Sequence, residues 1–179
     1  MTAEIEDDVW KFKIILAGAG AVGKTTLMNQ FVRGSFSGEY KATIGVDILS
    51  KEITLNRKRT YKIKLQIWDI AGQELFRSFR KRFFSNSRGV LLIFDLTVPQ
   101  SLSDLHTWIE DIYEIAGSIP IILIGNKVDL TELRTITQES IQEFLAKHDI
   151  STHFLTSALT GINVDDAFST LVEMMAPIK

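Results

Sequence analysis

The chain of 179 residues contains no cysteine and only three prolines. Without cysteine, this sequence has no disulfide bond, no thiol catalysis, no zinc–thiolate site and no cysteine for lipid attachment. No apolar run is long enough to span a bilayer, and the net charge of −2 favours neither nucleic acid nor a membrane as a partner. Residues 1–10 are acidic and show no signal-peptide pattern, so the cytoplasm is the expected compartment.

One short stretch carries the strongest functional signal, the octapeptide GAGAVGKT at residues 18–25. It matches G-x-x-x-x-G-K-[ST] and lies between an apolar strand-like run and an amphipathic helical pattern, the context in which this motif binds phosphate. Its glycines let backbone N–H groups approach a polyphosphate, and the positive end of the following helix faces the same anion. Lys24 is expected to reach the outer phosphates, and Thr25 to place a hydroxyl on Mg²⁺. The predicted phosphate-binding residues here are Gly18, Gly20, Ala21, Val22, Gly23, Lys24, Thr25 and Thr26.

Strand-like and helical patterns alternate along the whole chain. We expect strands at residues 12–17, 44–55, 61–68, 89–94, 119–124 and 153–155. Helical patterns lie between them, with Gly117 ending one helix and with Thr137 and Asn163 as N-caps of the last two. This alternation predicts an α/β fold with an open, mostly parallel sheet, helices on both faces, and ligands at the carboxyl ends of the strands. Residues 1–10 are expected to form an acidic extension, and residues 11–179 one domain.

A second motif, Asp69-Ile70-Ala71-Gly72-Gln73, ends the second strand of an expected hairpin. An aspartate at a strand end is the usual indirect partner of Mg²⁺ in phosphate-loop enzymes, and Gly72 can give its N–H to a γ-phosphate. Gln73 is predicted to orient an attacking water, which makes it a catalytic residue together with Lys24. Thr43, in a polar loop, offers a second hydroxyl to the metal.

A third motif, Asn126-Lys127-Val128-Asp129, follows the strand at 119–124. A carboxylate accepts two hydrogen bonds from adjacent N–H groups on one ring edge, and guanine has such an edge whereas adenine does not. Asp129 is therefore predicted to select guanine, with Asn126 bracing the loops and the stem of Lys127 covering the ring. Three more residues are predicted to contact guanine. Phe36 would pack edge-on against the base, and Ser157 or Ala158 would donate a backbone N–H to the base oxygen.

With these motifs in order, the chain resembles the small GTPases of the Ras superfamily, and most of all their Rab branch. The segments that carry the resemblance are GAGAVGKTTL, KATIGVD, WDIAGQE, FDLT, GNKVDL and TSALTGINV. The resemblance implies a P-loop NTPase fold with a six-stranded sheet, one antiparallel strand and five helices. It also implies a GTP/GDP switch with Mg²⁺ as cofactor, in which Thr43 and Gly72 contact the γ-phosphate. An activating protein, an exchange factor and effectors are then expected at switch regions 36–45 and 69–84, near the apolar side chains of Trp68, Phe83 and Phe84.

The chain departs from the pattern of this family at several positions. Leu159 stands where the family usually has the lysine of Ser-Ala-Lys, so one wall of the guanine pocket changes, and Ile48 stands where Rabs usually have phenylalanine. The sequence has no prenylated cysteine, so either a tail was trimmed or the protein does not anchor by lipid. A peripheral membrane contact would then rest on the hairpin turn at 57–59 or on a basic cluster, which can equally be a solvated face or bind an acidic partner. That cluster is Arg77, Arg80, Lys81 and Arg82.

Two other functions are compatible with the phosphate loop. A GTP-binding scaffold would hydrolyse GTP negligibly, although the presence of Gln73 favours hydrolysis. A phosphate-loop kinase would need an acceptor pocket and an arginine-bearing lid, and it leaves Asn126 and Asp129 without a role.

Replacing Gln73 with leucine tests the hydrolytic role. Gln73→Leu removes the amide expected to orient water, so GTP binding is kept while single-turnover hydrolysis is lost. Gln66→Leu, on the polar side of the hairpin strand, is the matched control and should hydrolyse GTP at the unmodified rate. An unchanged rate in Gln73→Leu would refute the catalytic assignment.

Overall fold

The computed structural model describes residues 9–34, 43–56, 60–72 and 77–176. Its strands are β1 (Val9–Ala17), β2 (Val46–Asn56), β3 (Thr60–Ile70), β4 (Gly89–Asp95), β5 (Ile121–Asn126) and β6 (His153–Thr156). Its helices are α1 (Lys24–Arg33), α2 (Arg77–Phe84), α3 (Pro99–Ser103), α4 (Leu105–Ala116), α5 (Gln138–Lys147) and α6 (Val164–Met175), with a short 3₁₀ turn, η2, at Thr131–Leu133. The strands form one sheet in the order β2-β3-β1-β4-β5-β6, in which only the β2–β3 pair is antiparallel. The predicted α/β sheet is confirmed.

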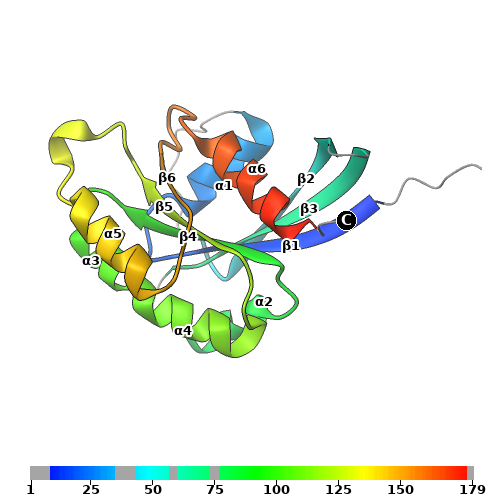
Figure 1. The fold of residues 1–179 in the computed structure, drawn as a ribbon, viewed down its shortest axis with the longest axis horizontal. Helices are drawn as coiled ribbons and strands as arrows, with labels where there is room; N and C mark the ends of the chain where they lie inside the picture. The colour runs from blue at the N-terminus through cyan, green and yellow to red at the C-terminus, as the bar shows by residue number, and fades with distance from the viewer. Residues whose placement is uncertain (1–8, 35–42, 57–59, 73–76, 177–179) are drawn as a thin grey trace, which may run out of the picture.

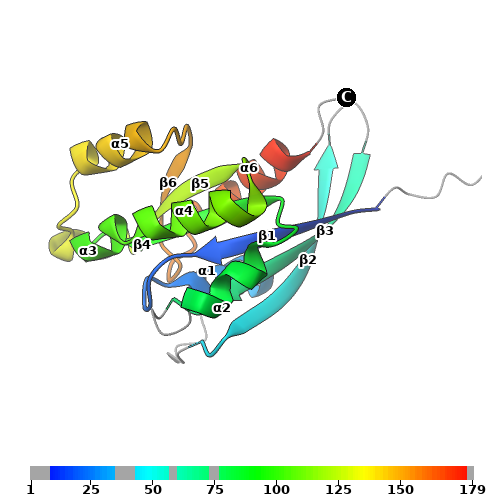
Figure 2. The same ribbon diagram turned by 90° about the horizontal axis from the view of Figure 1, so that it is seen from below.

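Helices cover both faces of this sheet, as Figures 1 and 2 show. On one face α1 and α6 pack against the strands, with Phe31 stacked on Phe168. On the other face α4 and α5 cover a second core that includes Phe94 and Trp108. Because successive strand residues point to opposite faces, Ile14 belongs to the first core and Ile15 to the second. The continuous apolar runs of β4 and β5 are therefore explained by burial on both faces.

The β2–β3 hairpin forms the edge of the sheet, as its alternating pattern predicts. On β3 the apolar Ile63, Leu65 and Ile67 are buried, whereas Lys62, Lys64 and Gln66 are exposed. One face of this edge therefore meets the core and the other meets solvent.

Several local features differ from the sequence-based expectation. β1 begins at Val9, inside the expected N-terminal extension, and Trp10 packs on Tyr61 of β3 with 4.5 Å between ring centroids. The helix expected around 102–115 is divided at Asp104 into α3 and α4, so the described residues contain six α-helices where the resemblance implies five. Thr137 caps α5 as predicted, accepting a hydrogen bond from the backbone N–H of Ser140. Asn163 occupies the N-cap position of α6 as predicted, but its side chain makes no capping hydrogen bond and its amide donates instead to the carbonyl oxygen of Leu155.

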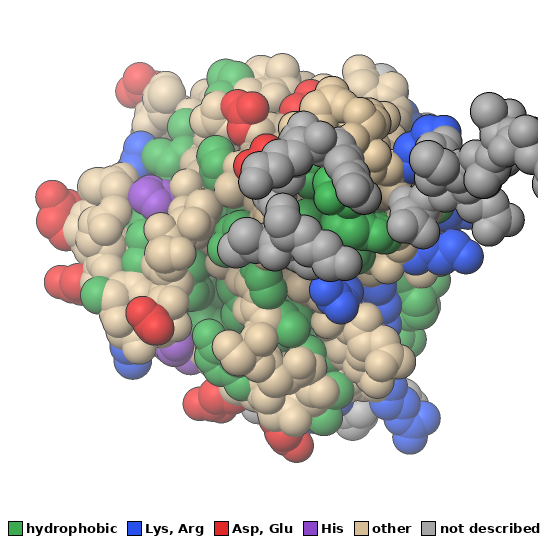
Figure 3. Space-filling view, turned by 45° about the vertical axis from the view of Figure 1, so that its right-hand side comes forward, with side chains coloured by type: hydrophobic (Ala, Val, Ile, Leu, Met, Phe, Trp, Pro, Cys, Tyr) green, Lys and Arg blue, Asp and Glu red, His purple; other side chains and the backbone are tan. Residues whose placement is uncertain are grey.

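The small net charge conceals an uneven distribution. Figure 3 shows Lys and Arg gathered toward the right of the face it presents and Asp and Glu toward the left. Among the described residues, no helix combines the length and the apolar character needed to cross a bilayer.

The aromatic stack between α1 and α6 is expected to be a major contribution to stability. Phe168 is fully buried and its ring centroid lies 3.9 Å from that of Phe31. Phe168→Ala should lower the free energy of unfolding by about 3–5 kcal/mol, because it removes apolar contacts and leaves a cavity. Urea titration followed by circular dichroism measures this loss. Leu133→Ala is the control, since its side chain is 61% exposed and the change should stay within about 0.5 kcal/mol.

Candidate functional site

The carboxyl ends of the parallel strands meet along one edge of the sheet, and the predicted motifs meet there. β1 leads into the glycine-rich loop, β3 carries Asp69 near its end, β5 ends at Asn126, and Ser157 follows β6. β4 ends at Asp95 beside them. This edge is where open α/β sheets bind their ligands, so segments far apart in the sequence form one candidate site.

The glycine-rich loop is held tightly against the neighbouring strands. Gly18 and Gly23 have positive φ angles of 143° and 97°. A Cβ on Gly18 would lie 2.1 Å from the carbonyl oxygen of Ile93 in β4, and one on Gly23 would lie 2.3 Å from the amide nitrogen of Asn126. Ala21 also has a positive φ of 63°, which is uncommon for a residue with a side chain. Both glycines are therefore required by space as well as by backbone conformation.

The loop leads into a helix whose amino end is open to an anion. Gly23 precedes α1, makes no side-chain cap, and no acidic residue lies in the first turn, where Thr26 is half-buried. Lys24 is buried, and its ammonium donates to the carbonyl oxygens of Gly18 (2.9 Å) and Ala19 (2.7 Å). A positive charge and uncapped helical N–H groups thus converge on the loop, which suits a polyphosphate.

Three oxygen-bearing side chains converge next to Lys24. The hydroxyls of Thr25 and Thr43 lie 2.9 Å apart, and both donate to Oδ2 of Asp69. Burial raises the pKa of Asp69, while the charge of Lys24 and the two hydroxyls oppose that rise. The other carboxylate oxygen, Oδ1, is buried and has no hydrogen-bond partner among the residues that the structure describes. Hard oxygen ligands around one carboxylate, with an unsatisfied oxygen among them, fit Mg²⁺, which binds through few protein groups and keeps water or phosphate oxygens as its other ligands.

The predicted switch segments reach this loop from the hairpin side. A Cβ on Gly72 would lie 2.5 Å from the backbone nitrogen of Gly20, so the backbone of Gly72 passes directly beside the loop. The N–H of Ala71 donates to the carbonyl oxygen of Gly45 (2.9 Å), which ties the ends of the two segments together. The predicted site residues Gln73 and Phe36 lie outside the described residues.

Asn126 connects three loops through one buried side chain. Its amide nitrogen donates to the carbonyl oxygen of Val22 in the glycine-rich loop (2.9 Å). Its amide oxygen accepts from the hydroxyl of Thr156 and from the N–H of Ala158, both at 3.1 Å. The phosphate loop and the loop after β6 are therefore fixed relative to each other, as expected from a bracing residue.

Asp95 lies on the same edge and belongs to the FDLT segment, but the motif analysis gave it no individual role. Its carboxylate forms a 2.6 Å ion pair with the ammonium of Lys127 and accepts from the N–H and hydroxyl of Thr97. Asp95 is 5% exposed and Lys127, whose φ is 70°, is 33% exposed. This ion pair fixes the direction of the lysine stem that was expected to cover the base. Asp95 ends a buried strand on the same edge as Asp69 and Asn126, and this position is the sequence signal that could have pointed to it.

Asp129 presents a buried acceptor without a donor. Its Oδ1 has no hydrogen-bond partner, and an unpaired buried polar atom is costly unless a ligand satisfies it. The backbone N–H groups predicted to meet a base oxygen are already paired, that of Ser157 with the carbonyl oxygen of Ile162 and that of Ala158 with Asn126. A base oxygen would therefore have to share the Ala158 donor with Asn126. Leu159, the predicted wall residue, is 50% exposed.

Exchanging the Asp129 carboxylate for an amide tests its proposed contact with the base. Asp129→Asn turns an N–H donor toward the N–H donors of guanine, so GDP affinity should fall on the order of 10⁴-fold. Xanthosine diphosphate, which carries an oxygen in place of the guanine amino group, should bind the variant more tightly than GDP does. Calorimetry with both nucleotides measures this, and Asp149→Asn is a surface control. Equal GDP affinity in Asp129→Asn and the unmodified protein would remove Asp129 from the site.

Comparisons with known proteins agree with this geometry. The sequence profile of the Ras family matches residues 13–176. The chain is 39% identical over 173 residues to the GTP-binding protein ypt3 of Schizosaccharomyces pombe, covering 96% of this chain and 78% of that protein. It is 40% identical over 167 residues to Ras-related protein Rab7 of Drosophila melanogaster (90% and 78% covered) and 39% identical over 168 residues to Ras-related protein Rab-30 of Homo sapiens (93% and 81%). The chain therefore belongs to the Ras family of small GTPases and is similar to its Rab and Ypt members.

Proposed function

We propose that the protein acts as a GTP/GDP switch in which the nucleotide lies along the carboxyl edge of the sheet. As a Ras-family member it is a GTPase that binds GTP and GDP together with Mg²⁺. The observation that carries the residue assignment is a pair of buried carboxylate oxygens without partners, Oδ1 of Asp69 and Oδ1 of Asp129. One lies among the oxygen groups suited to a metal and the other in the loop expected to hold guanine, with the phosphate loop braced between them by Asn126.

The phosphates are proposed to bind at the glycine-rich loop and Lys24. The N–H groups from Gly20 to Thr26, the ammonium of Lys24 and the N–H of Gly72 stabilise the charge that spreads over the γ-phosphate during transfer. Thr25 and Thr43, with Asp69 behind them, would hold Mg²⁺, which would supply positive charge to neutralise the phosphates. Gln73 orients the water that attacks the γ-phosphorus in line. At Gly18 and Gly23 the loop backbone packs closely against Ile93 and Asn126, and this packing keeps the N–H donors in place before the substrate binds.

The intrinsic hydrolysis rate is proposed to be low. Residues 35–43 contain no arginine, so the chain supplies no arginine from that segment to the transition state. An activating protein that inserts an arginine would raise the rate by about 10³–10⁵-fold. GTP would then persist until such a partner arrives, which is the behaviour of a switch.

Regulators and effectors are proposed to bind the surface formed by β2, β3 and α2. Ile44 is 84% exposed and Ile48 is 43% exposed, and Trp68 lies near Phe83 with 6.2 Å between centroids. Clusters of exposed apolar side chains mark interaction surfaces, and these residues adjoin Thr43 and Gly72. A change at the γ-phosphate would therefore be communicated directly to the binding surface.

The basic cluster proposed for a membrane or an acidic partner is only partly available. The ammonium of Lys81 is bound to Asp111 (3.2 Å) and Glu114 (2.5 Å) of α4. This cation fixes α2 to α4, and the side chains of Arg77 and Arg80 lie outside the described part of the chain. We propose that the protein works in the cytoplasm and does not bind nucleic acid, and that any membrane contact is peripheral.

A single experiment separates the switch from its alternatives. The nucleotide that co-purifies is released by denaturation and identified by chromatography, and the protein is then loaded with GTP and Mg²⁺ for single-turnover hydrolysis. GDP in the purified protein and slow release of phosphate are expected. GTP that persists even with candidate activators would favour a scaffold, and preferential binding of ATP in competition with GTP would favour a kinase.

A further inference from the structure

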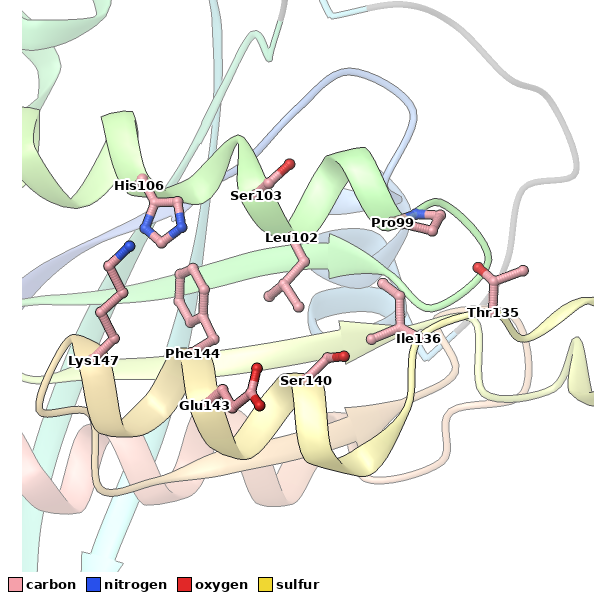
Figure 4. Close-up of a pocket in the computed structure, with 10 residues that line it drawn as sticks. All are labelled: Pro99, Leu102, Ser103, His106, Thr135, Ile136, Ser140, Glu143, Phe144 and Lys147. Carbon is pink, nitrogen blue, oxygen red and sulfur yellow. The ribbon is translucent and has the colours of Figure 1, made fainter.

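A groove lies between α5 and the segment formed by α3 and the start of α4 (Figure 4). Its volume is about 350 Å³, within the range of about 300–1,000 Å³ typical of small-molecule sites. None of the residues that line it belongs to the nucleotide site proposed above.

The floor of the groove is apolar and preformed. Leu102, Ile136 and Phe144 line it and are each at least 92% buried. The N–H groups of Thr135 and Ile136 both donate to the carbonyl oxygen of Leu96, at 3.1 and 3.2 Å, which fixes the loop wall to the end of β4. A rigid apolar floor can accept the body of a ligand without first having to become ordered.

One end of the groove is lined by His106, whose ring contacts the neighbouring His148. Nδ1 of His106 lies 2.5 Å from Nε2 of His148, and the ring of Phe144 packs against both, with centroid separations of 5.1 and 4.6 Å. Burial lowers the pKa of both imidazoles; Lys147 lowers that of His106 further, His106 and then Lys147 lower that of His148, and Glu110 opposes both shifts. In the tautomer in which Nδ1 of His106 accepts from Nε2 of His148, the proton of His106 lies on its own Nε2 and can be donated to a ligand.

Lys147 adds a positive charge to the same end. Figure 4 shows its side chain extending across the groove toward His106, while the carboxylate of Glu143 stays along α5. Within the described residues, no hydrogen bond or ion pair to the Lys147 ammonium is found. The residues that line the groove include one lysine, Lys147, and one glutamate, Glu143, so a dianion such as a phosphate monoester would have a single cation to pair with, and the charge pattern fits a monoanion better.

We propose that this groove binds a small monocarboxylate with an apolar body. Its carboxylate pairs with the ammonium of Lys147 and the imidazole of His106, and its apolar part covers Leu102, Ile136 and Phe144. The proposal does not depend on the nucleotide assignment, because the two sites share no residue.

Amide NMR titration of the full chain, loaded with GDP and Mg²⁺, tests this with 4-phenylbutyrate as the probe. Saturable shifts are expected for α3, α5 and residues 135–136. 4-Phenylbutyramide, which has the same body without the charge, should bind about fivefold more weakly, because an exposed ion pair contributes modestly. Phenyl phosphate should bind more weakly than the carboxylate because Glu143 repels its second charge.

Variants connect the binding to the named side chains. Lys147→Met keeps the length of the stem and should weaken 4-phenylbutyrate binding about fivefold, whereas Lys11→Met on β1 should leave it unchanged. Ser140→Phe places a ring in the groove and should abolish binding, with an unchanged melting temperature showing that the fold is intact. Absence of saturable shifts, equal binding of the amide, tighter binding of phenyl phosphate, or unmodified binding by Lys147→Met each overturns the proposal.

Discussion

The buried amide of Asn126 is the contact on which the ligand edge of this protein depends. Asn126 is 1% exposed, and its side chain hydrogen-bonds to Val22 in the glycine-rich loop, to Thr156 at the end of β6 and to Ala158 just after it. Leaving a buried donor or acceptor of this kind unpaired costs about 1–3 kcal/mol, so the three segments are held in one arrangement. The glycine-rich loop and the segment after β6 are therefore fixed relative to each other, as the proposed nucleotide site requires.

Near Asn126, two carboxylates are placed so that they favour binding of a ligand at a cost to the stability of the protein without one. Burial of Asp69 raises its pKa, and one of its oxygens lacks a partner, as does one oxygen of Asp129. The carboxylate of Asp95, in contrast, is paired directly with Lys127. A ligand that satisfies the unpaired oxygens binds only the folded state, so nucleotide and Mg²⁺ would also stabilise the fold.

Much of this architecture could be read from the amino-acid pattern because it depends on near neighbours. The alternation in β3 places Ile63 and Lys64 on opposite faces, and the cap of α5 by Thr137 involves a residue three positions away. The features that were missed depend on contacts between distant segments. Asp95 pairs with Lys127, which follows β5, and the side chain of Asn163, whose φ is 56°, donates to Leu155 instead of capping α6.

The sequence by itself determined the order of strands and helices, and it identified the glycine-rich loop as a phosphate-binding loop. It could do so because hydrophobic periodicity and the backbone freedom of glycine are properties of short segments. Tertiary structure decided which distant groups meet: Asn126 with Val22, 104 positions apart, and His106 with His148, 42 positions apart. It also decided which polar atoms remain unpaired and where a groove opens between α3 and α5. These outcomes depend on how the helices pack against the sheet, and the sequence of a short segment does not determine that packing.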